Sequence, residues 1–173
     1  RCYSINQGMN DMAEHLRPLA SSLSLKIAIA IIEQALKLRR AAGLLPLAIT
    51  VLDSGGQLVA FQREDGCGVL RFDIAFGKAW GALGMGMPTR QIRDRLAARP
   101  AFQSALATAS DGRFIPVPGG VLILDTTGTA IGAVGISGDA SDKDEYCAIE
   151  AIRAAGYGAD PAQPDPAWRE AGL

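Results

Sequence analysis

The sequence predicts an α+β domain in which helices pack on a five-stranded antiparallel sheet. Five short apolar segments stand in one group of two and one group of three, with turn residues between the members of each group. Such short turns join antiparallel strands, because parallel neighbours need long crossovers. Segments with a helical repeat of apolar residues precede, separate and follow the two groups. The 173 residues, 49% apolar and 20% charged, suffice for one domain with one core.

The first helix is predicted over residues 23–43. Its charged side chains follow one narrow stripe and apolar residues fill the rest, which is typical of a mostly buried amphipathic helix. Gly43 suits the left-handed residue that ends many helices. A β-hairpin follows, with strands over residues 46–53 and 57–63 joined by a Ser-Gly-Gly turn.

A second helix is predicted over residues 72–85, after a glycine-rich loop. Its aromatic residues share one face, and Gly77, Lys78 and Gly81 share the other. Each interior glycine costs about 1 kcal/mol relative to alanine. We therefore expect another backbone, a ligand or another subunit to approach this glycine face closely.

The remaining elements are two short helices, three strands and a last helix. Thr89 is the expected N-cap of the first short helix, and the second starts near Pro100. The strands are expected over residues 113–117, 121–125 and 130–137. The last helix is expected to begin with Ser141 as its N-cap and to run to about residue 156.

This pattern predicts one domain over residues 21–156. Residues 1–20 are expected to be poorly ordered or an artificial addition, since the chain starts with arginine rather than methionine. Residues 157–173 hold three prolines and few apolar residues, so we expect a tail that is loose or that covers a neighbour.

Charge and cysteine content narrow the class of partner. A net charge of -1 gives no basic field for a nucleic acid, and the longest apolar run is too short to span a membrane. Three widely spaced cysteines and one histidine do not predict a clustered zinc site or a disulfide scaffold. We therefore expect a cytoplasmic protein with neither nucleic-acid nor membrane partners.

Two glycine-bearing apolar segments carry a family resemblance. Residues 113–125 and 131–139, read with the Arg-Glu-Asp-Gly sequence at 63–66 and the Lys-Ala pair at 78–79, resemble the GlcG/HbpS-like family. That family includes a secreted heme-binding protein and the C-terminal domain of PduO-type proteins. The resemblance covers about residues 20–156 and implies a profilin-like or PAS-like α/β/α sandwich. It also implies binding of heme or a related tetrapyrrole, and a homo-oligomer of two or more copies.

One candidate site combines basic residues with glycine turns. Arginine makes bidentate bonds to carboxylates, and a buried lysine with a lowered pKa can bind an anion or form an imine. Successive glycine amides can also form an anion-binding nest. The residues expected to line one pocket for an anionic small molecule are Arg63, Asp65, Gly66, Lys78, Pro118, Gly119 and Gly120. In this pocket Gly120→Val is expected to block binding without disturbing the fold.

Plainer explanations exist for each of these residues. Arg63 and Asp65 also fit a surface ion pair beside an Asp-Gly turn, and Lys78 fits a solvated helix face. Spaced glycines also fit close packing of a helix on a strand.

Candidate ligands for a heme iron are few. His15 is the only histidine, and Cys67 is the only cysteine in a predicted loop. Both also fit ordinary exposed positions. The second functional hypothesis is an enzyme in which Lys78 and Asp65 are catalytic and Arg63 holds a small carboxylate or carbonyl metabolite.

Overall fold

One antiparallel sheet of five strands organises the domain. A computed structural model describes residue 17 and residues 19–173. The sheet has the order β2-β1-β4-β3-β5, and every neighbouring pair is antiparallel. Its strands are β1 (Ala48–Asp53), β2 (Leu58–Arg63), β3 (Gly120–Leu124), β4 (Ala130–Ser137) and β5 (Gly158–Asp160). The predicted α+β fold with a five-stranded antiparallel sheet is thus confirmed.

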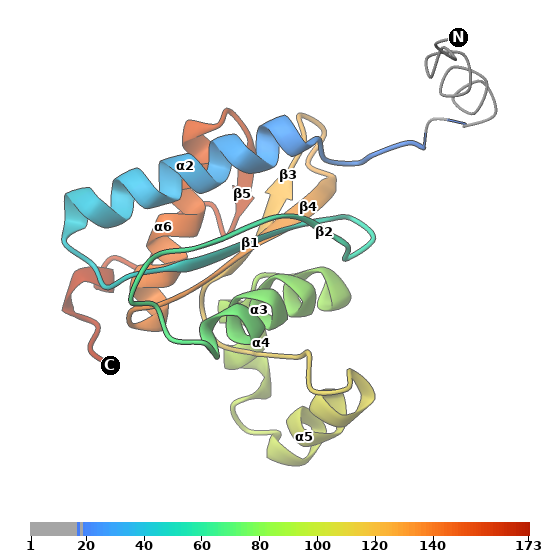
Figure 1. Cartoon of the computed structure of the whole chain (residues 1–173). Helices are drawn as coiled ribbons and strands as arrows, with labels where there is room; N and C mark the ends of the chain where they lie inside the picture. Colours follow the sequence, from blue (N-terminus) through green and yellow to red (C-terminus); the bar gives the residue numbers. More distant parts are fainter. Residues whose placement is uncertain (1–16, 18) are drawn as a thin grey trace, which may run out of the picture.

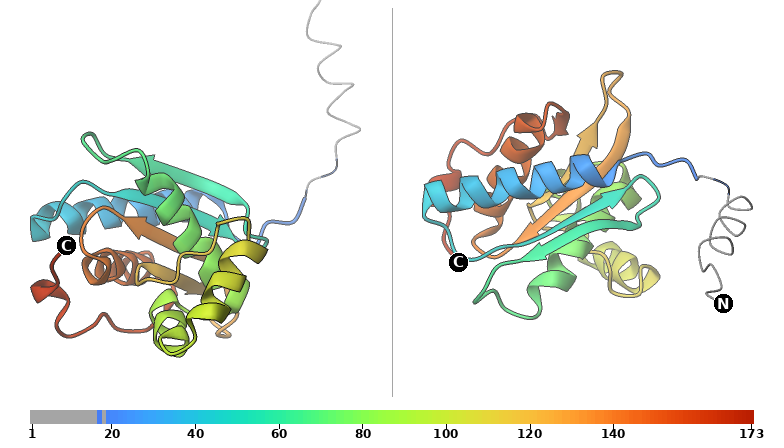
Figure 2. Two further views of the ribbon diagram at one scale, coloured as in Figure 1. Left: turned by 90° about the horizontal axis from the view of Figure 1, so that it is seen from below. Right: turned by 45° about the horizontal axis from the view of Figure 1, so that its top comes forward.

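Helices cover both faces of this sheet (Figures 1 and 2). α2 (Leu25–Ala42) and α6 (Ser141–Ala154) pack on one face, and α3 (Arg71–Met85) packs on the other against β1, β3 and β4. The expected core positions Val51, Leu122 and Val134 are buried. The result is an α/β/α sandwich.

Two further helices, α4 (Thr89–Leu96) and α5 (Pro100–Ala109), continue from the α3 side. Ile92 and Leu96 of α4 are buried against Phe114. By contrast, α5 buries none of its residues, and in Figure 1 it extends below the rest of the domain. This helix is therefore the element held least firmly by apolar burial.

The residues expected to form a strand at 113–117 form no strand. They cross the glycine face of α3 as extended chain, where Gly77 lies against Ile115 and Gly81 against Phe114. An apolar run has the same appearance in sequence whether it pairs with a strand or packs on a helix. The close approach predicted at the two glycines is therefore made by residues 113–115 of the same chain, through the Arg113 carbonyl and the Ile115 side chain at Gly77 and the Phe114 ring at Gly81.

The fifth strand comes from the segment that follows α6. β5 pairs with β3, with Ala159 opposite Ile123. Further along, the Trp168 ring stacks on the Tyr146 ring of α6, with 3.7 Å between ring centroids and 8° between planes. Residues expected to form a tail that is loose or that covers a neighbour thus complete the sheet and cover α6.

Helix ends follow the sequence within a residue or two. Gly43 is left-handed as expected, with φ 67°, and ends α2. Thr89 and Ser141, expected as N-caps, are instead the first residues of α4 and α6, after Pro88 and Ala140. Their side chains do not cap these helices, and the Thr89 hydroxyl bonds to Gly120. No helix among the described residues has the length and apolarity that a membrane crossing requires.

Candidate functional site

Lys78 is buried at the centre of the predicted site. α3 places its ammonium Nζ 2.9 Å from Asp144 Oδ2 of α6, and Nζ also donates a hydrogen bond of 2.9 Å to the Ile136 carbonyl of β4. Each of the two charged side chains is 1% exposed. The pair links the helices on opposite faces of the sheet.

Burial controls the chemistry of this pair. Desolvation raises the pKa of Asp144, and the nearby Lys78 ammonium opposes that rise. The second carboxylate oxygen, Oδ1, accepts a hydrogen bond of 3.1 Å from the Asp139 amide. An ammonium enclosed in this way has no exposed surface on which a metabolite can form an imine. The geometry therefore gives no support to the enzyme hypothesis built on Lys78.

Gly119 and Gly120 lie beside Lys78, as the shared-pocket hypothesis requires. A Cβ atom added to Gly119 would stand 2.9 Å from Lys78 Nζ. However, the Gly120 amide donates a hydrogen bond of 2.8 Å to Thr89 Oγ1, so it is not free to bind an anion. A Cβ on Gly120 would also meet the Lys78 carbonyl and the Thr89 methyl group. Gly120→Val would disrupt this packing rather than fill a cavity, which corrects the expectation from sequence.

The Arg63–Gly66 loop is built around a residue that the sequence analysis did not single out. Arg63 and Asp65 are exposed, and within the described chain no hydrogen bond or ion pair joins them. Between them, Glu64 Oε2 accepts a hydrogen bond of 2.9 Å from the Leu47 amide and lies 3.3 Å from Arg39 Nε. Glu64 therefore anchors the loop, and Arg63 and Asp65 point to solvent.

His15 and Cys67 are the two candidate ligands for a heme iron. His15 lies outside the described residues. Cys67 is partly exposed, and burial raises the pKa of its thiol although Arg71 and Arg63 oppose the rise. Its thiol is therefore not activated as a thiolate. Among residues 19–173 no group of three His, Cys, Asp or Glu side chains is placed to hold a metal ion.

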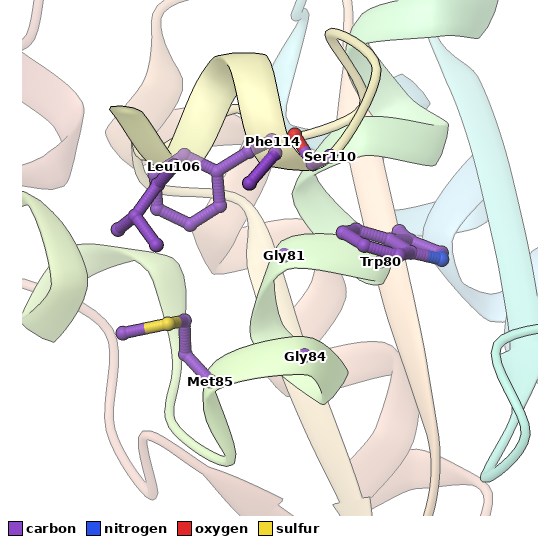
Figure 3. A pocket seen from close by; sticks show the side chains of 8 residues that line it. Trp80, Gly81, Gly84, Met85, Leu106, Ser110 and Phe114 are labelled. Atoms are coloured by element: carbon purple, nitrogen blue, oxygen red, sulfur yellow. The ribbon is translucent and has the colours of Figure 1, made fainter. Parts of the chain in front are cut away.

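An apolar groove lies between α3 and α5 (Figure 3). We call it the α3–α5 groove. It encloses about 160 Å³. Its lining residues are Trp80, Gly81, Gly84, Met85, Leu106, Ala109, Ser110 and Phe114.

Two glycines leave the α3 side of this groove open. The rings of Trp80 and Phe114 lie on either side of Gly81 and Gly84, whose lack of side chains leaves the α3 surface open (Figure 3). A Cβ on Gly84 would meet only the Trp80 ring, at an ordinary contact distance of 3.7 Å. The groove depends on Phe114 and α5 folding back over α3, a contact that no local sequence pattern indicates.

A cation stands next to the groove. The Arg113 guanidinium carbon lies 4.6 Å from the centroid of the Trp80 ring, and the arginine side chain is 48% exposed. Its nearest acidic partner is Asp111, which is itself almost fully exposed and 3.8 Å away. Such an exposed ion pair is weak. Arg113 Nε also donates a hydrogen bond of 3.1 Å to the Ser110 carbonyl, so this bond and the contact with Trp80 hold the guanidinium at the edge of the groove.

The fold is a small α/β/α sandwich, and an apolar groove lies between its helices α3 and α5. The chain matches the family described as "Haem degrading protein HbpS-like" over residues 23–153, and it belongs to that family. A curated relative from Citrobacter freundii, an uncharacterized 15.0 kDa protein of the dhaT-dhaS intergenic region, is 32% identical over 107 residues. That match covers 62% of this chain and 74% of the relative. The family predicted from the sequence is thus confirmed.

Solved structures share the fold. The crystal structure of a PduOC:heme complex has a TM-score of 0.71 at 24% identity, over 80% of this chain and 98% of that one. Protein ORFY of Klebsiella pneumoniae gives 0.70 at 26% identity, with 81% and 94% covered. A double mutant of HbpS from Streptomyces reticuli gives 0.62 at 25% identity, with 81% and 88% covered.

Proposed function

We propose that this protein binds heme or a closely related tetrapyrrole in the α3–α5 groove. Membership of the HbpS-like family supports the ligand class. The observation that carries the proposal for this chain is the apolar groove between α3 and α5, which the rings of Trp80 and Phe114 help to line. Aromatic rings stack favourably on a planar macrocycle, which is itself apolar on both faces.

The residues around the groove suit the other parts of such a ligand. A tetrapyrrole carries propionate groups, and arginine makes paired, charge-assisted hydrogen bonds to carboxylates. Arg113 stands at the groove: its guanidinium lies over the Trp80 ring, its Nε donates to the Ser110 carbonyl, and its acidic partner Asp111 is exposed. Heme would supply an iron atom able to change oxidation state, while the protein residues hold the ring and exclude water from its faces.

The groove must widen to hold a tetrapyrrole, and α5 is the wall that we expect to move. About 160 Å³ is less than the roughly 300–1,000 Å³ of a usual ligand pocket. Because α5 buries none of its residues, moving it outward costs less than moving α3, which packs directly on the sheet. We expect α5 to move away from α3 as the ligand enters.

Hemin titration tests this proposal. The purified protein is expected to bind hemin with a shifted Soret band and quenching of Trp80 fluorescence. Gly84→Leu places a side chain in the groove without a backbone clash, so it should abolish or strongly weaken this binding. Ala101→Leu places the same leucine side chain at an exposed position of α5 outside the groove and serves as the control.

Each outcome of the hemin titration leads to a different conclusion. Loss of binding in Gly84→Leu alone supports the groove. Equal binding in all three proteins would place the ligand elsewhere on the chain. Absence of any binding by the unchanged protein would refute the proposed function itself.

A further inference from the structure

A second buried carboxyl, that of Glu145 in α6, does not line the α3–α5 groove. Its side chain is fully buried, and neither of its oxygens accepts a hydrogen bond within the described chain. Arg90 of α4 is its ionic partner, with Nε 3.3 Å from Oε2. By contrast, both oxygens of Asp144 accept hydrogen bonds. A buried carboxylate without hydrogen bonds is costly, so the folded chain accommodates the protonated form of Glu145 better.

Arg90 also holds the segment that follows β5. We call residues 161–170 the C-terminal strap. Arg90 Nη2 donates a hydrogen bond of 2.8 Å to the Gln163 carbonyl, and Nη1 lies 3.9 Å from Asp165 Oδ2. One guanidinium thus joins the buried carboxyl of α6 to the strap.

The strap is lightly held along its middle. None of residues 162–167 is buried, and the next firm contact is the stack of Trp168 on Tyr146. The other element joined by this guanidinium is α4, which buries Ile92 and Leu96. Segments with few buried contacts open at the lowest cost. Water therefore reaches the buried carboxyl more easily if the strap moves than if α4 does.

We propose that the C-terminal strap is a lid beside Glu145 that stays closed while this carboxyl is protonated and opens when it ionises. Four charged groups face Glu145. Arg90 and Arg93 of α4 favour its ionised form, whereas Asp142 of α6 and Asp165 of the strap oppose it. Burial outweighs the two arginines and raises the pKa of Glu145 to about 7.

The direction of the switch follows from proton linkage. With the strap open, Glu145 is hydrated and its pKa returns to the ordinary value of about 4.5, whereas the closed strap keeps it at about 7. The closed form binds the proton more tightly, so raising the pH through this interval favours the open form. Between about pH 5 and about pH 8 the open population should rise by on the order of 100-fold.

Hydrogen exchange of the intact protein tests this lid. Protection of the amides in residues 162–170, corrected for the intrinsic effect of pH, should fall between about pH 5 and about pH 8, while β1 stays more protected at both. Glu145→Gln keeps the size of the side chain but cannot ionise, so its strap should be equally protected at both pH values. Glu33→Gln, the same change at an exposed site on α2, should retain the pH dependence.

A second variant changes the switch without removing it. Asp165→Asn removes a charge that raises the pKa of Glu145 and keeps a side-chain oxygen for the Ala167 amide, so the fall in protection should be smaller. Strap protection that is constant or rises with pH would overturn the proposal, as would an unchanged pH dependence in Glu145→Gln. Equal protection of the strap and β1 at every pH would mean that the strap opens only when the whole domain unfolds, which also excludes a lid.

Discussion

Lys78 shows how a buried charge can be structural rather than reactive. Its partners, Asp144 and the Ile136 carbonyl, satisfy the ammonium where no water reaches it. Removing one member of such a pair leaves the other charge buried and unpaired, which costs far more than the pair itself contributes. The pair therefore fixes how α3 and α6 are placed across the sheet.

We expect Lys78→Met to lower the free energy of unfolding by about 3–5 kcal/mol, because Asp144 would remain buried without a counter-ion. The double variant Lys78→Met with Asp144→Asn should recover part of this loss, since the amide keeps the acceptor for Asp139 without the charge. Urea unfolding of the three proteins measures both effects. A single variant as stable as the unchanged protein would show that the pair is dispensable.

Glu145 gives the protein a pH dependence. Its side chain is fully buried, its Oε2 lies 3.3 Å from Arg90 Nε, and neither oxygen accepts a hydrogen bond within the described chain. Desolvation raises the pKa of Glu145 to about 7, although Arg90 opposes the rise. The folded state therefore holds this proton more tightly than the unfolded state, so stability falls as the pH rises from about 4.5 to about 7.

Across that window the Glu145 contribution is about 3 kcal/mol, at about 1.4 kcal/mol per pKa unit. Glu145→Gln cannot titrate, so its stability relative to the unchanged protein should improve between about pH 5 and about pH 8. Urea unfolding at both pH values is the measurement. Parallel pH profiles for the two proteins would contradict this assignment.

Residue-level chemistry could be predicted from sequence only in part. The helical repeat placed Lys78 among glycines and away from Trp80, and the structure agrees. Its partner Asp144 is 66 residues away, and no local pattern links the two. The same applies to Glu64, which takes its role from the distant amide of Leu47 and from Arg39.

At the scale of elements, glycines let α3 lie directly on the sheet. A Cβ on Gly135 of β4 would overlap the Ala75 carbonyl and press on the Ala79 amide, both in the α3 backbone. Gly84, on the opposite surface of α3, faces open space apart from Trp80. Glycine is thus required at position 135 and can be replaced at position 84.

The same substitution should have opposite effects at these two sites. Gly135→Ala should destabilise the protein by about 3 kcal/mol or more, because α3 must move off β4. Gly84→Ala should stabilise it by up to about 1 kcal/mol, since alanine favours the helix. Thermal unfolding of both variants measures the contrast. A loss of stability in Gly84→Ala would mean that the groove wall is more tightly packed than described.

Elements defined by local signals were predictable, and those defined by pairing were not. The hairpin of β1 and β2 follows from two apolar runs around a glycine turn. β5 is only Gly-Ala-Asp, which has no strand pattern; its pairing with β3 makes it a strand. Residues 113–117 show the converse: they have the apolar pattern of a strand, but they pack on a helix instead of joining the sheet.

At the scale of the whole molecule, we expect self-association. The two surfaces that suggested it in the sequence are filled internally: residues 113–115 cover the α3 glycines, and Trp168 packs on Tyr146. Val69 and Leu70 remain 83% and 63% exposed. They precede α3, whose Phe72 ring packs on Phe61 of the edge strand β2.

A homodimer or larger assembly through this apolar surface would bury Val69, Leu70 and the free edge of β2. Light scattering should give at least twice the chain mass of 18.1 kDa. Leu70→Lys should reduce it toward one chain, whereas Leu25→Lys, at an exposed site on α2, should not. A single-chain mass for the unchanged protein at micromolar concentration would exclude this association.

The late position of β5 also matters while the protein is being made. β3 pairs with β4 on one side as soon as that strand has emerged from the ribosome, but its other edge has no partner until α6 and the residues after it have followed. An unpaired strand edge recruits strands from other chains. A nascent or proteolysed chain that stops after α6 would therefore leave this edge of β3 unpaired, and we expect it to aggregate more readily than a chain that includes β5.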